Sequence, residues 1–196
     1  YLGRSELTEQ MSLAAPAILS GSLSVEEKNA FYQFVKDSLL HQGEEVNGDA
    51  RTEIVIGSFL AQTGAVDEGI VHLKRAVELT PGKQLAYFEL GSALINKGDN
   101  NGALAIFKKA LDLAPEYLEA KKLYLLGAVY AGDTKVEGSL VTSIPEKEII
   151  FDDRILSAYY AKKRFQEVIL ILERRVKLDP VNAATYQEYI KQVRAL

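Results

Sequence analysis

The sequence offers few side chains that could carry out catalysis or hold a metal ion. Its only histidines are His41 and His72, and each stands alone in a helical pattern, which is typical of a core or surface histidine. Asp152 and Asp153 are adjacent, so on a helix they would point about 100° apart. We interpret them as first-turn acids favoured by the helix dipole rather than as a hydrolytic carboxylate pair. The sequence therefore predicts no enzymatic activity, no metal site and no cofactor.

Charge and composition restrict the partners that this chain could bind. The 196 residues carry a net charge of −4 and include no cysteine, so thiolate chemistry and disulfide bonds are excluded. An acidic balance disfavours broad attraction to nucleic acid or to anionic membranes. The basic clusters, such as Lys108 with Lys109, alternate with acidic residues, which indicates a solvated face. We expect no nucleic-acid partner and no membrane insertion by this segment, because no run approaches the roughly 18 apolar residues of a span.

The elements that would position any functional side chain are clearest in residues 84–117. An apolar stripe at helical spacing is followed by the turn residues 98–101 and then by a second stripe, with Pro115 just beyond it. The two stripes consist of Tyr87, Leu90, Gly91 and Leu94, then Ala103, Ile106, Phe107, Ala110 and Leu113. Neither helix could bury its stripe alone, so the segment predicts a helix–turn–helix unit that packs against neighbours.

The same pattern recurs along the chain. A shift of 34 residues places Gly91 on Gly57, Phe107 on Leu73, Ala110 on Ala76 and Pro115 on Pro81. Repetition at this period predicts an all-α helical solenoid of stacked helix–turn–helix repeats. We predict one domain over residues 1–196, composed of an N-terminal helix pair (1–49), repeats at 50–83, 84–117, 118–148 and 149–182, and a terminal helix (183–196).

The N-terminal pair is expected to differ from the repeats. Its first helix is predicted over about residues 6–19, with Pro16 as a kink or an early stop. Ser24 and Glu27 have the spacing of a capping box at the start of a second helix over about 25–46. That helix should place five residues on one side, and residues 47–49 should form the next break, with Asp49 as a cap. The five are Phe31, Phe34, Val35, Leu39 and His41.

Several residues depart from the repeat pattern, and we expect local structural differences where they occur. Gly57 and Gly91 indicate a close approach of the partner helix, whereas Leu125 stands at the aligned place and should loosen it. The repeat at 118–148 should have a short second helix that ends near Pro145. Arg175 occupies a place expected to be small, so we expect a helix tilted outward or a side chain that points to solvent. The terminal helix keeps apolar residues and could form a homo-oligomer contact.

Residues 84–117 resemble a tetratricopeptide repeat at eight places, namely Tyr87, Leu90, Gly91, Leu94, Ala103, Phe107, Ala110 and Pro115. The resemblance implies a right-handed solenoid that acts as a protein–protein interaction scaffold, with a protein or peptide partner in a concave groove. The groove positions that it implies are Arg51, Ile54, Ser58, Gln62, Phe88, Ser92, Asn96, Lys122, Leu126, Tyr130, Arg154, Ser157 and Tyr160. Ile54 and Ser58 replace residues of the clamp that chaperone-binding members use for a carboxylate, so a chaperone tail is not the expected partner.

A second resemblance involves the phrases LGRSELTEQ, NGDARTEIVIGSFL, PGKQLAYFELGSALINKGD, IFDDRILSAYYAKKRF and RRVKLDPVN. They are similar to the C-terminal region of bacterial O-antigen ligase/polymerase-type membrane proteins. That resemblance implies an accessory module of a membrane-bound polysaccharide-assembly protein, on the extracytoplasmic side and tethered through a preceding membrane domain. The start at Tyr1, with Met11 the only methionine, fits such a fragment. The alternatives are a free-standing soluble adaptor, cytosolic or exported, and a module that binds glycan in the groove.

Overall fold

The computed structural model describes residues 2–45 and 49–196 of the chain. Within these residues every regular element is a helix, which confirms the all-α prediction. The helices form two compact units, the first extending to Leu113 and the second covering Ala114–Leu196. Each unit is described by itself below, and the prediction of a single domain stays a prediction.

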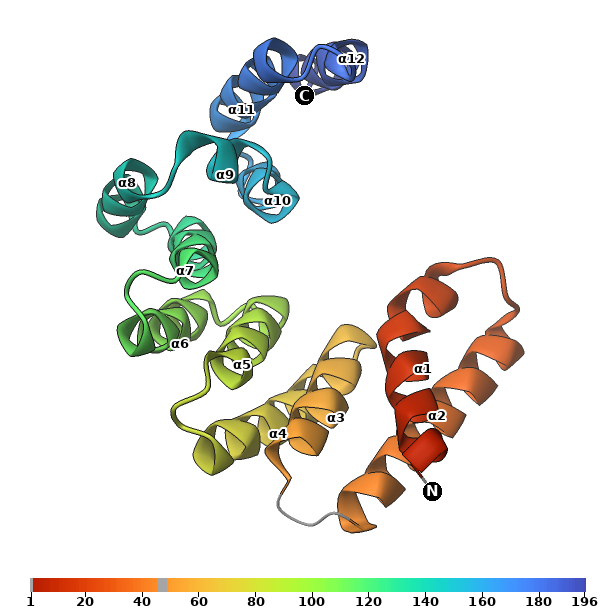
Figure 1. Cartoon of the computed structure of the whole chain (residues 1–196). Coiled ribbons are helices and arrows are strands. Elements are labelled where there is room, and N and C mark those ends of the chain that lie inside the picture. The colour runs from red at the N-terminus through yellow and green to blue at the C-terminus, as the bar shows by residue number, and fades with distance from the viewer. Residues whose placement is uncertain (1, 46–48) are drawn as a thin grey trace. The chain divides into compact units, whose positions relative to one another are not determined.

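The first unit contains three helix pairs, in which each pair packs on the next (Figure 1). Its helices are α1 (Leu2–Ser20), α2 (Val25–Glu45), α3 (Ala50–Gln62), α4 (Val66–Leu79), α5 (Gln84–Lys97) and α6 (Asn100–Leu113). The α3–α4 and α5–α6 pairs coincide with the repeats predicted at 50–83 and 84–117. The α1–α2 pair lies against α3, so the N-terminal residues extend the same stack.

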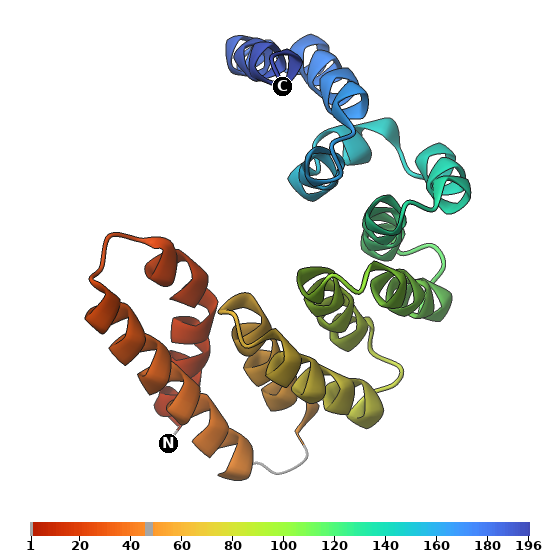
Figure 2. The same ribbon diagram turned by 180° about the vertical axis from the view of Figure 1, so that it is seen from behind.

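The second unit contains two further repeats and the terminal helix (Figure 2). Its helices are α7 (Leu118–Ala131), α8 (Thr134–Ser143), α9 (Glu146–Ile150), α10 (Asp153–Ala161), α11 (Phe165–Leu178) and α12 (Ala183–Arg194). The short second helix of the third repeat is confirmed, because α8 has 10 residues where α4, α6 and α11 have 14. The one-turn helix α9 was not predicted; it follows Pro145, which serves as its N-cap.

Side chains cap several helices at the places expected from the sequence. The capping box is confirmed, since the Ser24 amide donates to Glu27 Oε2 at 2.9 Å and the Glu27 amide donates to Ser24 Oγ at 3.2 Å. Asp49 caps α3 by accepting from the Thr52 amide at 2.9 Å. Hydrogen bonds from the Thr52 side chain and from backbone amides hold the pKa of Asp49 below its usual value. These contacts satisfy amides that a helix start leaves free.

The N-terminal pair departs from its prediction in two respects. Pro16 lies inside α1, which continues to Ser20, so the early stop was wrong. Phe34 and His41 are exposed on α2 and do not join the buried side formed by Val35 and Leu39. The core of this region consists of Ala15, Val35, Leu39, Ile56, Phe59 and Leu60, and therefore joins α1, α2 and α3. The predicted break at Asn47 and Gly48 lies outside the described residues.

The predicted close approach at Gly57 and Gly91 is confirmed. A Cβ atom built on Gly57 would lie 2.9 Å from the carbonyl oxygen of Gly69 on α4. A Cβ atom built on Gly91 would lie 2.6 Å from Cζ of Phe107, a side chain that is fully buried. Both distances are shorter than van der Waals contact, so neither position has room for a side chain.

Two charged residues of the predicted repeats, Glu53 and Arg175, are buried. Glu53 lies between His72 and Arg75 of α4, with His72 Nδ1 at 2.7 Å and Arg75 Nε at 3.2 Å. The expectation of a solvent-facing Arg175 was wrong, because its side chain is buried. Arg175 Nε donates to the Ile150 carbonyl at 2.6 Å and Nη1 donates to Asp153 at 2.7 Å. A guanidinium can occupy this place because α9 and α10 supply acceptors.

Substitution of Gly91 by alanine tests the close approach. We expect Gly91→Ala to lower the free energy of unfolding by about 1–3 kcal/mol, because the buried ring of Phe107 must shift. Gly138→Ala is the matched control, since it is also helical but nothing lies within 4 Å of the added Cβ. The control should raise stability by about 0.5–1 kcal/mol. Urea unfolding that gave both variants the same sign of change would contradict this packing.

Lys163 offers a second test, because it is the only described non-glycine residue with positive φ, at 57°. It stands in the turn between α10 and α11, as Gly98 and Gly132 do between α5 and α6 and between α7 and α8, with φ of 85° and 74°. Lys163→Gly should raise the free energy of unfolding by about 1 kcal/mol, because the left-handed conformation strains a residue with a Cβ atom. Lys162→Gly, at φ −86°, should be destabilising instead. Thermal melts of the two variants distinguish these outcomes.

Candidate functional site

The first unit contains a groove between α1, α3 and α5, which we call the α1/α3/α5 groove. Its volume is about 730 Å³. Its larger apolar lining residues are Leu13, Ile54, Val55, Phe59, Leu79 and Leu85. Leu13 is 74% exposed and Leu85 is 55% exposed, so part of this apolar surface is covered by nothing within the unit. A concave, largely apolar site of this size is typical of a ligand-binding pocket.

Polar side chains line the same groove. Arg51 Nη2 donates to Glu9 Oε2 at 2.7 Å, which joins α3 to α1 across one end. Ser58 Oγ donates to Glu89 Oε2 at 2.8 Å, which joins α3 to α5. Gln62 and Lys83 are exposed at the groove. These groups could orient the backbone or the charged side chains of a bound segment.

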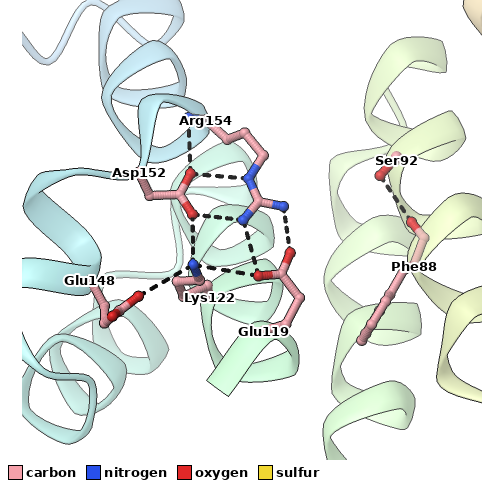
Figure 3. Close-up of polar contacts among 7 residues, drawn as sticks. All are labelled: Phe88, Ser92, Glu119, Lys122, Glu148, Asp152 and Arg154. Atoms are coloured by element: carbon pink, nitrogen blue, oxygen red, sulfur yellow. Dashed lines mark hydrogen bonds and ion pairs between the residues drawn. The ribbon is translucent and has the colours of Figure 1, made fainter. Parts of the chain in front are cut away.

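The structure brings together only some of the positions predicted for the first unit. Arg51, Ser58 and Gln62 all line the α1/α3/α5 groove, as does Ile54. Phe88, Ser92 and Asn96 of α5 are not part of its lining; Phe88 stands between the lining residues Leu85 and Glu89, and the other two lie further along the helix. The Ser92 hydroxyl donates to the Phe88 carbonyl at 2.9 Å, as Figure 3 shows, so it is engaged within its own helix.

In the second unit, Lys122 and Arg154 belong to one ion-pair network (Figure 3). Arg154 donates from Nε and Nη2 to Asp152 at 3.0 and 2.6 Å. It also donates from Nη1 and Nη2 to Glu119 at 2.5 and 3.2 Å. Lys122 Nζ lies 3.3 Å from Asp152, 3.4 Å from Glu119 and 3.6 Å from Glu148. The two basic side chains are thus occupied by acids of the same unit.

This ion-pair network lowers the pKa of two of its acids, Asp152 and Glu119. Burial alone would raise the pKa of Asp152, but hydrogen bonds and charge from Arg154, with Lys122, outweigh it and lower the pKa to about 2. Hydrogen bonds from Arg154 likewise hold the pKa of Glu119 below its usual value. Asp152 also caps α10 by accepting from the Arg154 amide at 3.0 Å. The network therefore serves the fold by fastening the start of α10 to α7.

The predicted aromatic positions of the second unit are partly used in packing. Tyr130 is half-buried, and burial raises the pKa of its hydroxyl. The ring of Tyr160 contacts Phe165 edge-on at a centroid distance of 5.8 Å and lies 6.3 Å from the ring of Tyr189. Tyr160 therefore helps to join α10 to α11 and α12.

The candidate site includes residues that the sequence did not reveal. Glu9 and Leu13 of α1 form one wall of the groove, and Glu89 closes another side. The 34-residue period could not identify the α1 wall, because α1 lies outside the repeats. Glu119 and Asp152 were also missed as partners of Arg154; their acidic character near Lys122 and Arg154 was the available signal. In the described part of the chain no cluster of three or more metal-ligating side chains occurs.

The ion-pair network gives a pH-dependent prediction. Because the pKa of Asp152 is lowered in the folded state, its stabilising effect should be complete above about pH 4 and lost as the pH falls toward 2. Asp152→Asn should lower the free energy of unfolding by about 1–3 kcal/mol at neutral pH. Urea unfolding across pH 2–7 should show the difference from the natural chain shrinking below about pH 4. A difference that stayed constant would contradict the proposed ion pairs.

Comparisons with known proteins agree with this architecture. Residues 85–117 match the family model described as tetratricopeptide repeat. No curated protein matches the chain. Among solved structures, the chain is similar to TTC0263, a thermophilic tetratricopeptide repeat protein of Thermus thermophilus. The identity is 16%, the TM-score is 0.61, and the alignment covers 96% of this chain and 100% of that one.

Two further solved structures show the same likeness. MamA is 17% identical with a TM-score of 0.54, and the alignment covers 89% of this chain and 95% of that one. YrrB, described as a tetratricopeptide repeat protein with an unusual peptide-binding site, is 18% identical with a TM-score of 0.52 over 81% and 86% of the two chains. Such identities show the fold alone. The resemblance to O-antigen ligase/polymerase proteins receives no support from these comparisons.

Across residues 2–45 and 49–196, no helix combines the length and the apolar character needed to cross a bilayer. The repeat matched at 85–117 and the similar solved structures together identify the architecture. The chain has the tetratricopeptide-repeat fold.

Proposed function

We propose that the chain binds an extended segment of a partner protein in the α1/α3/α5 groove. The observation that carries the proposal is the combination of exposed apolar side chains, Leu13 and Leu85, with a polar rim in one concavity. Apolar anchors that become buried supply most of the affinity of such interfaces, and polar groups around them set the register.

The rim retains hydrogen-bonding capacity for a ligand. Arg51 remains 76% exposed although it bonds to Glu9, and a guanidinium has five N–H donors. Gln62 offers both a donor and an acceptor to a peptide backbone. Glu89 carries a negative charge and accepts a hydrogen bond from a neutral hydroxyl, so it could still pair with a basic residue of the partner.

The second unit is the weaker place for the same function. Lys122 and Arg154, which were predicted to contact a partner, are held by Asp152 and Glu119. A ligand would have to replace those charge-assisted hydrogen bonds before it gained its own. We therefore assign binding of the extended segment to the first unit.

Two finer hypotheses remain separate from this proposal. An accessory role in a membrane-bound polysaccharide-assembly protein rests on the resemblance of sequence phrases alone, and groove binding does not depend on it. A glycan ligand would use Tyr130, Arg154 and Tyr160, two of which take part in packing or ion pairs. Oligosaccharides titrated into the labelled protein would reveal that alternative by shifting resonances of these residues.

Selection of peptides from a displayed library, followed by affinity measurement, tests the proposal. Leu13→Ser should weaken the selected peptides by about ten-fold or more, because it removes an exposed apolar anchor from the groove. Val71→Ser is the matched control, since Val71 is a 66% exposed aliphatic residue of α4 that does not line the groove. Equal affinities for the two variants, or selected peptides that shift only resonances of the second unit, would overturn the assignment.

A further inference from the structure

The second unit contains another groove, between α8 and α11, which we call the α8/α11 groove. Its volume is about 510 Å³. Helix α8 lines it with four residues from Thr134 to Val141 at positions i, i+3, i+4 and i+7. Helix α11 lines it with four residues from Glu167 to Arg174 at the same spacing. Ile149 and Ile150 of α9 line it between the two stripes.

The short third repeat leaves apolar side chains exposed in this groove. Helix α8 has 10 residues and ends at Ser143, whereas the second helices α4, α6 and α11 each have 14. Four more residues would extend α8 by about 6 Å. Val141 is 42% exposed and Leu170 is 57% exposed, and they come from the two facing stripes. Each of the two walls thus contributes an aliphatic side chain whose surface is not buried.

One end of the groove holds more negative than positive charge. The buried carboxylate of Glu137 accepts from the Tyr159 hydroxyl at 2.8 Å and from Arg164 Nη1 at 2.6 Å. Arg164 also donates from Nε and Nη2 to Glu167 Oε1, at 2.9 and 2.6 Å. Two carboxylates therefore share one guanidinium.

The other end of the α8/α11 groove has equal numbers of positive and negative charges. Arg174 Nε lies 3.4 Å from Glu146 Oε1, which is one positive charge for one negative charge. The lining as a whole contains three glutamates and two arginines. Glu137 is enclosed by Tyr159 and Arg164, which bond to both of its oxygens. Glu167 accepts through Oε1 alone, so its carboxylate is the one that a ligand can reach at the acidic end.

We propose that the α8/α11 groove binds a short amphipathic helix of a protein partner, whose aliphatic side chains cover Val141 and Leu170 and whose basic residue pairs with Glu167. Two stripes at helical spacing that line one groove suit a helix laid between them, with anchors at i, i+3 and i+4. The excess carboxylate selects a positive charge at one end. This site is distinct from the α1/α3/α5 groove and does not depend on the function proposed for it.

A pair of hydrocarbon-stapled helical peptides provides the probe. Both carry leucines at i, i+3 and i+4, and they differ at one flanking position, which is lysine in one and glutamate in the other. The full chain carries Leu13→Ser, so that the first groove does not compete. At low salt, where charge pairing is least screened, the lysine peptide should bind about ten-fold more tightly than the glutamate peptide. Methyl resonances of Val141, Leu170 and Ile149 should shift on binding.

Two variants test the separate parts of the site. Leu170→Gln should abolish the methyl shifts and weaken the lysine peptide by about ten-fold or more, while Val71→Gln in the first unit leaves its affinity unchanged. Glu167→Gln keeps a hydrogen-bonding side chain and removes the charge, so the preference for lysine over glutamate should fall to about two-fold or less. Equal affinity of the two peptides for the natural groove, or methyl shifts confined to other surfaces, would overturn the proposal.

Discussion

The close approach of the two helices within a repeat is the contact on which the array depends. Gly57 of α3 faces Gly69 of α4 backbone to backbone, and Gly91 of α5 receives the ring of Phe107 from α6. An amphipathic helix of 13 or 14 residues is marginal in water, so its apolar stripe must be buried against a partner. The absence of a side chain at these positions lets the paired stripes meet. The floor of the α1/α3/α5 groove is then held by helices that are already fixed to their partners.

In the second unit, larger and charged residues are buried between the packed helices. Leu125 stands where the glycines align and is fully buried, while Glu137 and Arg175 are buried with hydrogen-bonding partners. Buried charges are tolerated where each is paired. Both oxygens of Glu137 accept hydrogen bonds, whereas Arg175 uses Nε and Nη1 and its buried Nη2 has no hydrogen-bond partner. The third repeat also has a shorter second helix and the inserted turn α9, and these two features shape the α8/α11 groove.

Periodicity made the repeats and their helices predictable, because apolar spacing, turn residues and capping residues are local signals. The capping box followed from the types and spacing of Ser24 and Glu27, and the cap at Asp49 from its residue type after a break in the helical pattern. The places that could not be predicted depend on tertiary partners. Arg175 is buried because the Ile150 carbonyl and Asp153 are within reach, and α9 forms in a segment with no repeat counterpart.

The candidate site was likewise predictable only in part from the sequence. Four of the predicted groove positions, Arg51, Ile54, Ser58 and Gln62, line one cavity. The wall from α1 lies outside any repeat, so no period could reveal it. Lys122 and Arg154 kept their predicted helices, while their acidic partners became apparent only in three dimensions.

The Glu137 cluster bears on how such an array could change in length. Tetratricopeptide units joined only by apolar contacts can be duplicated or deleted as modules, because each interface resembles the next. Glu137 of the third repeat instead depends on Tyr159 and Arg164 of the fourth. Exchange of the fourth repeat for a copy of the second would leave this carboxylate buried without the hydroxyl and the guanidinium from which it accepts. We therefore expect the third and fourth repeats to be duplicated or exchanged only as a pair. This cluster places no such limit on the repeats at 50–83 and 84–117.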